Sequence, residues 1–521
     1  MSSRAIVRIV IVAMVGLRAL AAPAAAPAGL SRSDIRWLNR VTFGIDSTTI
    51  ASYQRLGRSK FLDEQLHEPS TGLGAAASAL DAAVKAVPVM ERTAEDAIAA
   101  NRAEQQRINA IADPDEKQKA RNLLNQTGNQ AVYETSKVLL MRSAASPSQL
   151  REQMTWFWMN HFSVFAQKAN VRWTLADYQE AVRAHSLGKF SDLVMATLTS
   201  PAMMEYLDNA QSATGKINEN YARELMELHT LGVSGGASGS AYTQQDVQEL
   251  ARVLTGAGVN FSGTSPRLPP AVQPMYVKRG AFEFNPARHD KGTKVVLGHT
   301  FQPGGLDEIE NAVVMLCRQP ATARFITKKL ATYFIADTPP APLLDRMTRT
   351  FTDTDGSIAA VLKTMFLDKA FLAALDKPEP ALKKFKDPEQ FVVSSVRLAY
   401  DGKTITNFHP MVNWLQQLGE PLYLRVTPDG YPLTEDSWTS SGQLVKRFEI
   451  ARQIGAGNAG LFNNDDNTPG PNIGFPLLNS RLFYSAIEPA LAAKTTAALA
   501  RASSQQEWNL LLLASPDWMQ R

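Results

Sequence analysis

The chain has 521 residues, with 54 lysines and arginines against 50 aspartates and glutamates, which gives a formal net charge of +4. Without Arg4, Arg8 and Arg18, which lie in an apolar leader, the balance is 51 basic against 50 acidic residues. A near-neutral chain excludes the electrostatic footprint of a protein that binds nucleic acid or an anionic membrane. The single cysteine, Cys317, excludes an intrachain disulfide, and its apolar neighbours predict a small buried side chain.

Residues 1–26 have the pattern of a cleaved signal peptide. Arg4 and Arg8 give a positive start, residues 9–17 form an apolar core, and residues 19–21 or 24–26 offer small-residue cleavage sites. The core is shorter than the ~20 residues that cross a bilayer. We therefore expect an exported protein, periplasmic or secreted, with no transmembrane anchor after cleavage.

Residues 31–521 predict a single helical domain. Residues 31–70 favour two short helices, the first from Ser31 or Ser33 to Gly44. The Ala-, Gln-, Glu-, Lys- and Arg-rich residues 73–143, broken at Pro114, predict a pair of long, polar, antiparallel helices. Further helices are expected at 150–165, 173–187, 190–199, 201–209, 218–231 and, with interruptions, 306–400. Residues 235–240 are rich in glycine and predict a loop.

Strand signals are confined to two short segments. Residues 281–284 and 294–301 carry them, and we expect the two segments to pair as a hairpin. Residues 401–443 predict a loop-rich segment. The fold class is therefore mainly α, a large multi-helix globular fold with a minor β-hairpin.

A set of motif-like segments occurs in a fixed order along nearly the whole chain. These are residues 156–164, 218–225 with 229–233, 242–252, 289–298, 320–326 and 429–432. Together they resemble a bacterial family catalogued as domain of unknown function 1800. Two departures are the small residues after Gly235-Gly236 and Ala257, where the family tends to have Trp.

The resemblance implies an exported protein and carries over no catalytic residues. Family members are often encoded beside a second uncharacterised family, domain of unknown function 1501, which resembles alkaline phosphatases and sulfatases. It therefore implies a neighbouring-gene, phosphatase- or sulfatase-like exported protein as a partner.

The helix expected at 218–231 carries the densest group of ionisable side chains. Its helical spacing places Glu219, Arg223, Glu227 and Glu224 on one face, opposite an apolar stripe. These carboxylates could form an acid–base pair or a hard-metal site. They could equally be a solvated face on which Glu219 and Glu227 each pair with Arg223.

Two histidines lie on apolar helix faces. His161 falls among aromatic residues in the helix at 150–165, and His229 falls in the apolar arc of the helix at 218–231. Each is either a core histidine with hydrogen-bonded ring nitrogens or a functional group, such as a metal ligand or proton shuttle.

His289 and Asp290 lie in a polar loop before the second strand segment. The pair could serve as a general base with its orienting group, or in a metal site. Because adjacent side chains seldom bond each other well, we expect Asp290 to contact another residue.

Three functions fit these observations. The first is a metal-assisted hydrolase or lyase that acts on an envelope polymer or polysaccharide. Its catalytic residues would be Glu224, Glu227, His161, His289 and Asp290, and His161, His229, Glu224 and His289 would bind a divalent metal. The second is a non-catalytic binding or assembly partner of the phosphatase- or sulfatase-like protein. The third is a carbohydrate-binding envelope protein, which requires an exposed row of Trp414, Tyr423 and Trp438.

Overall fold

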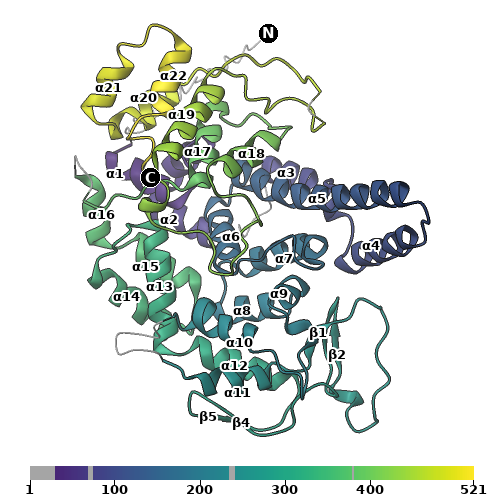
Figure 1. Cartoon of the computed structure of the whole chain (residues 1–521). Helices are drawn as coiled ribbons and strands as arrows, with labels where there is room; N and C mark the ends of the chain where they lie inside the picture. Colours follow the sequence, from purple (N-terminus) through teal and green to yellow (C-terminus); the bar gives the residue numbers. More distant parts are fainter. Residues whose placement is uncertain (1–29, 68–73, 234–240, 378–380, 467) are drawn as a thin grey trace, which may run out of the picture.

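The computed structural model describes residues 30–521 apart from 68–73, 234–240, 378–380 and 467 (Figure 1). The predicted signal peptide and the predicted glycine-rich loop lie outside the described residues. Among the described residues, α-helices dominate and strands are short, which confirms the mainly α fold class.

The N-terminal helices begin where their capping residues predict. Helix α1 (Arg32–Val41) starts after Ser31, which forms a capping box with Asp34. Helix α2 (Ser47–Leu66) is capped by Asp46 and bends at Gly57, whose φ is 72°. The two helices predicted in this region are confirmed.

A polar helical arm extends from the body of the molecule (Figure 1). It contains α3 (Ala75–Lys85), α4 (Ala94–Asn109) and the 32-residue α5 (Pro114–Ala145). Pro114 is the first residue of α5, as its fixed φ favours. The prediction of only two helices was wrong, because Pro88 opens a 3-10 turn and Thr93 caps a new helix after it.

The centre of the molecule is built from shorter helices. They are α6 (Gln149–His161), α7 (Val171–His185), α8 (Phe190–Leu198), α9 (Pro201–Tyr206), α10 (Glu219–Glu224) and α11 (Gln244–Val253). Helix α10 continues into a π-helix over Leu225–Thr230. This single π-helical stretch interrupts the helix that the sequence predicted over 218–231.

Two small antiparallel sheets follow α11. Strands β1 (Ala257–Val259), β3 (Phe282–Phe284) and β2 (Val277–Arg279) form one sheet in that order, and β4 (Lys294–Val296) pairs with β5 (His299–Phe301). The predicted pairing of residues 281–284 with 294–301 was therefore wrong. Leu297 and Gly298 have φ of 51° and 77°, so the second segment turns back on itself as its own two-residue hairpin.

Helices return from residue 306 to the C-terminus. They are α12 (Leu306–Cys317), α13 (Pro320–Phe334), α14 (Ala341–Asp353), α15 (Ile358–Phe366), α16 (Lys369–Asp376), α17 (Pro388–Tyr400), α18 (His409–Gln417), α19 (Ser441–Gly455), α20 (Arg481–Ala486), α21 (Ala493–Leu499) and α22 (Gln505–Leu513). The predicted loop-rich segment 401–443 contains α18, a 3-10 turn over Glu435–Ser437 and the first residues of α19.

The aromatic residues of that segment are buried. Trp414, Tyr423 and Trp438 are 2%, 7% and 4% exposed. The Trp414 indole donates to the Gln453 side chain, and the Trp438 indole donates to the Pro432 carbonyl. The predicted exposed row was wrong, because long-range packing covers these rings.

One cluster of buried hydrophobic side chains extends from Leu30 to Met519, and a smaller cluster lies beneath the arm. Cys317 is part of the main cluster, as predicted, and burial raises the pKa of its thiol. Within the described parts of the chain, no helix is both long and apolar enough to cross a membrane.

Candidate functional site

The last residue of α6, His161, lies in an aromatic environment close to helix α13. It is 2% exposed, and its ring is 4.5 Å from that of Phe162 and 5.4 Å from that of Trp158 between centroids. The prediction of a buried histidine beside aromatics is confirmed. Its Nε2 lies 3.1 Å from the His229 carbonyl oxygen, and its Nδ1 lies 2.8 Å from Lys329 Nζ.

These two contacts assign the protonation state of the pair. The carbonyl of His229 accepts only, so His161 donates from Nε2 and its Nδ1 accepts from the Lys329 ammonium. Burial, followed by the Lys329 charge, lowers the pKa of His161 well below its usual value. His161 is therefore a neutral imidazole that orients an ammonium group.

Lys329, on α13, has no carboxylate within ion-pair distance among the described residues. Its ammonium lies 5.6 Å from the centroid of the Phe325 ring. Burial lowers the pKa of Lys329 to about 8, and the Asp429 carboxylate opposes that shift. A lysine whose pKa is close to neutrality can exchange a proton at physiological pH.

The π-helix Leu225–Thr230 carries His229, which lies beside His161. Its widened turn is closed by the bond from the Leu231 amide to the Met226 carbonyl, 2.8 Å, and π-helical turns are frequent at functional sites. Gly232 follows with φ of 86°, and a Cβ there would lie 3.0 Å from the Phe325 ring. The chain thus needs glycine here both for its backbone conformation and for close packing.

His229 is fully buried, as its place in the apolar arc predicted. Its ring centroid is 6.1 Å from that of His161 and 5.0 Å from that of Phe162. Neither ring nitrogen has a hydrogen-bond partner among the residues that the structure describes. Burial, followed by the Lys329 charge, lowers the pKa of His229 to about 3, so this imidazole is neutral as well.

The carboxylates of α10 and the π-helix divide into two kinds. Glu219 and Glu227 each lie 3.6 Å from the Arg223 guanidinium, which confirms the i,i+4 ion pairs of the solvated-face alternative. Glu224 is half-buried, and it makes no ion pair with a described residue. Burial, then Glu227 and Asp429, raise the pKa of Glu224, while Arg223 opposes them.

A loop between α18 and α19 brings Asp429 to the site. The Asn160 side chain makes two hydrogen bonds to the Tyr431 backbone: it donates to the carbonyl at 3.0 Å and accepts from the amide at 2.6 Å. Gly430 has φ of 74°, and a Cβ there would lie 2.1 Å from the Asn160 carbonyl oxygen. This tight clamp places Asp429 where its charge raises the pKa of both Lys329 and Glu224.

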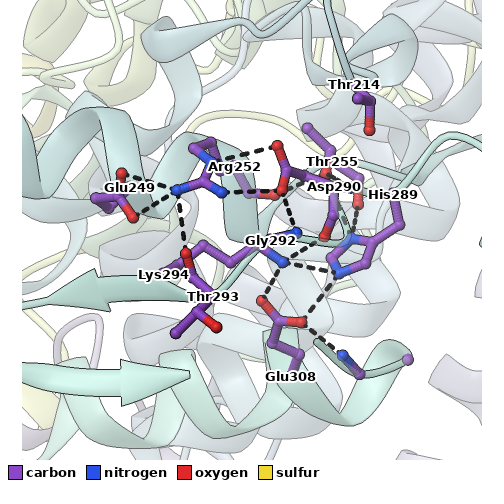
Figure 2. A network of polar contacts seen from close by, with 12 residues as sticks. Thr214, Glu249, Arg252, Thr255, His289, Asp290, Gly292, Thr293, Lys294 and Glu308 are labelled. Carbon is purple, nitrogen blue, oxygen red and sulfur yellow. Dashed lines mark hydrogen bonds and ion pairs between the residues drawn. The ribbon is translucent and has the colours of Figure 1, made fainter. Parts of the chain in front are cut away.

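His289 and Asp290 belong to a different network, between α11 and α12 (Figure 2). The His289 Nδ1 lies 2.7 Å from the Thr255 carbonyl oxygen, and its Nε2 lies 3.0 Å from Glu308 Oε2. Lys294 is fully buried and forms a 2.8 Å ion pair with Glu308 Oε1. Lys294 also donates to the Asp290 carbonyl, so every charge in this core is paired.

Asp290 contacts a residue other than His289, as predicted. Its carboxylate accepts from Arg252 at 3.0 and 3.2 Å and from the Gly292 amide at 2.8 Å. Arg252 in turn binds Glu249, at 2.8 Å (Figure 2). Because its charged groups are paired with one another within the fold, the arrangement is that of a structural network.

The structure thus brings only some of the predicted site residues together. His161 and His229 are neighbours, and Glu224 and Glu227 lie close enough to affect each other electrostatically. No hydrogen bond or ion pair between described residues joins His289 or Asp290 to that group. Lys329 and Asp429 were missed: Asp429 lay in a segment of the family resemblance, whereas Lys329 carried no signal in the sequence.

The predicted divalent metal would need several ligand side chains in one place. Within the part of the chain that the structure describes, no three His, Cys, Asp or Glu side chains gather into a group that could hold a metal ion. At His161, the His229 carbonyl and the Lys329 ammonium occupy both ring nitrogens. Metal binding by His161, His229, Glu224 and His289 stays a prediction, and no step below uses it.

Comparisons with known proteins give one family and no relative of known function. No curated protein and no solved structure matches the chain. A family described as "Protein of unknown function (DUF1800)" matches residues 36–520. The match covers the N-terminal helices, the site around Lys329, the network around Glu308 and the C-terminal helices. The chain therefore belongs to the DUF1800 family.

Proposed function

We propose that this protein is an enzyme that cleaves a polymer by acid–base catalysis, with Lys329 as the general acid and Glu224 as the general base. The observation that carries the proposal is the Lys329–His161 contact. An ammonium without a carboxylate partner is held at 2.8 Å by a neutral, buried imidazole. Two of its three protons are left for other acceptors.

The pKa of Lys329 is lowered and the pKa of Glu224 is raised, so the two values lie closer together than usual. Burial lowers the pKa of Lys329 to about 8, which makes its ammonium a stronger acid. Burial and neighbouring carboxylates raise the pKa of Glu224, which makes its carboxylate a stronger base. Titratable groups that their surroundings drive toward the working pH are typical of acid–base sites.

In hydrolysis, the Glu224 carboxylate takes a proton from water while the water oxygen bonds to the electrophilic carbon. The bond to the leaving oxygen breaks, and Lys329 protonates that oxygen. In an elimination, Glu224 instead takes the proton from carbon and Lys329 plays the same part. His161 orients the ammonium without exchanging a proton, because its own pKa is far too low.

The substrate class follows from the predicted compartment. The signal peptide predicts export, so we propose a polymer or polysaccharide of the cell envelope as the substrate. The assembly-partner alternative, with the phosphatase- or sulfatase-like protein, predicts binding without turnover. The enzyme hypothesis and the assembly-partner hypothesis therefore predict opposite results in one experiment.

That experiment incubates the mature protein with envelope polymers and polysaccharides and follows new chain ends. Hydrolysis gives reducing ends alone, whereas elimination also gives an unsaturated product. Lys329→Met and Glu224→Gln should each lower the rate about 10²–10⁴-fold, the usual contribution of a general acid or base. The matched controls are Lys328→Met, at an exposed position on α13, and Glu219→Gln, on the same helix as Glu224.

Equal rates in Lys329→Met and Lys328→Met would exclude the assigned acid. No turnover of any polymer, together with co-purification of the phosphatase-like protein, would favour the assembly-partner function.

A further inference from the structure

A cavity lies between α18 and α19, apart from the residues around Lys329. It has a volume of about 290 Å³ and is lined by His409, Pro410, Asn413, Trp414, Gln417 and Gln453. None of these side chains is a carboxylate, an ammonium or a guanidinium. A polar cavity without formal charge is suited to a neutral ligand that both donates and accepts hydrogen bonds.

Helix α18 supplies one wall as a regular stripe. His409, Asn413 and Gln417 are spaced four residues apart, so they share one face of the nine-residue helix. The stripe is ~12 Å long, from a rise of 1.5 Å per residue. The Asn413 and Gln417 side chains are exposed and make no hydrogen bond to a described residue. Each therefore offers one carbonyl and one amide group to a ligand.

The base of the cavity is rigid. The Trp414 indole, 2% exposed, donates to Gln453 Oε1 at 3.0 Å, which fixes that amide with its NH₂ group unused. The His409 ring stacks on Tyr133 with centroids 3.7 Å apart and an interplanar angle of 3°. Tyr133 is itself held by a 2.6 Å bond to Asp465. Gln453 and His409 are thus positioned before any ligand arrives.

The start of α18 is also tied to the segment beyond α19. Asn407 accepts from the His409 amide at 3.0 Å and donates to the Gly460 carbonyl at 3.1 Å. This holds the first turn of α18, and with it His409 and Pro410, in place.

We propose that this cavity is a binding site for a neutral oligosaccharide. Sugar hydroxyls both donate and accept, which matches a row of carboxamides, and the flat His409 and Pro410 rings offer surfaces for the apolar faces of sugars. Extended peptides instead bind by adding to a free sheet edge or by filling apolar pockets, and neither feature lines this cavity. The proposal does not depend on the chemistry assigned to Lys329.

Calorimetric titration of the full-length mature protein with cellohexaose, maltohexaose and chitohexaose tests the proposal. Oligogalacturonate and hexa-alanine represent charged sugars and peptides. At least one neutral sugar should bind, and Asn413→Ala/Gln417→Ala should weaken it about tenfold, the loss expected for two amide hydrogen bonds. The control Gln416→Ala, an exposed amide of α18 outside the cavity, should bind like the unchanged protein.

Binding in the cavity should persist in Lys329→Met, which separates it from polymer held at the proposed acid–base site. The proposal is overturned if no neutral sugar binds, if only oligogalacturonate or hexa-alanine binds, or if the double variant binds like Gln416→Ala.

Discussion

Two lysine–histidine contacts in this molecule, Lys294 with His289 and Lys329 with His161, have opposite surroundings. In the network of Figure 2, Lys294 and His289 both contact Glu308, and these contacts lower the pKa of the glutamate despite its burial. In the site at α6, Lys329 contacts the neutral His161 and the Phe325 ring and pairs with no described carboxylate. The pKa of Glu224, which like Lys329 is influenced by Asp429, is raised. The same residue types therefore stabilise the fold in one place and remain available for chemistry in the other.

The difference lies in how burial is compensated. Lys294 is fully buried and its charge is paired at 2.8 Å, so the desolvation cost is offset by the ion pair. Lys329 is partly buried, and its charge has no such pair among the described residues. Its burial therefore lowers its pKa to about 8. Unpaired, shifted groups of this kind gather at functional sites.

The largest expected effect separates the two lysines by stability. Lys294→Met removes the only ammonium that pairs with Glu308 among the described residues and leaves the buried carboxylate with His289 and the Gly304 amide, which should lower the free energy of unfolding by ~3–5 kcal/mol. Lys329→Met removes an ammonium that has no carboxylate partner among the described residues but leaves the buried His161 Nδ1 without its donor, so it should cost only ~1–2 kcal/mol. Urea unfolding of both variants measures this. Equal destabilisation would mean that the comparison is wrong.

The second expectation concerns the pH dependence of the proposed activity. Lys329 acts as an acid only while protonated, so kcat/KM should fall as the pH rises through about 8. Because Asp429 raises the pKa of both Lys329 and Glu224, Asp429→Asn should move both limbs of the profile to lower pH. Initial rates across pH test this, with Asp436→Asn as the control. An alkaline limb that does not move would argue against Lys329 as the acid.

The smallest effect is expected at His229, whose two buried ring nitrogens lack partners. Replacing an unsatisfied polar group by an apolar one is close to neutral or stabilising, so His229→Leu should change the free energy of unfolding by ~1 kcal/mol or less. In His289→Leu, by contrast, Glu308 loses a partner, and the loss should be larger. Thermal unfolding of the two variants decides this. A strong destabilisation in His229→Leu would show that this imidazole holds a group of its own.

Much of the local structure could be predicted from the chain. Ser31 caps α1 where the sequence places the start of the first helix, and α5 begins at Pro114, where the sequence predicts a break. The burial of His161 and His229 followed from helical periodicity. So did the ion pairs of Arg223, because i,i+4 neighbours meet in any helix.

The candidate site was predicted only in part. Lys329 meets His161 across 168 residues, and no local pattern marks such a contact. The prediction of an exposed row of Trp414, Tyr423 and Trp438 was wrong for a related reason. An aromatic residue in a loop looks exposed until the partners that cover it, such as Gln453 for Trp414, are known.

The sequence alone determined the mainly α class, the starts of several helices and the faces on which the ionisable residues lie, because caps and periodicity act over a few neighbouring residues. The tertiary structure decided which lysine meets which carboxylate and how the two strand segments pair. It also decided which cavity carries no charge. Those outcomes depend on packing between distant segments: burial lowers the pKa of Lys329, which has no carboxylate partner among the described residues, whereas the charge of Lys294 is paired with Glu308.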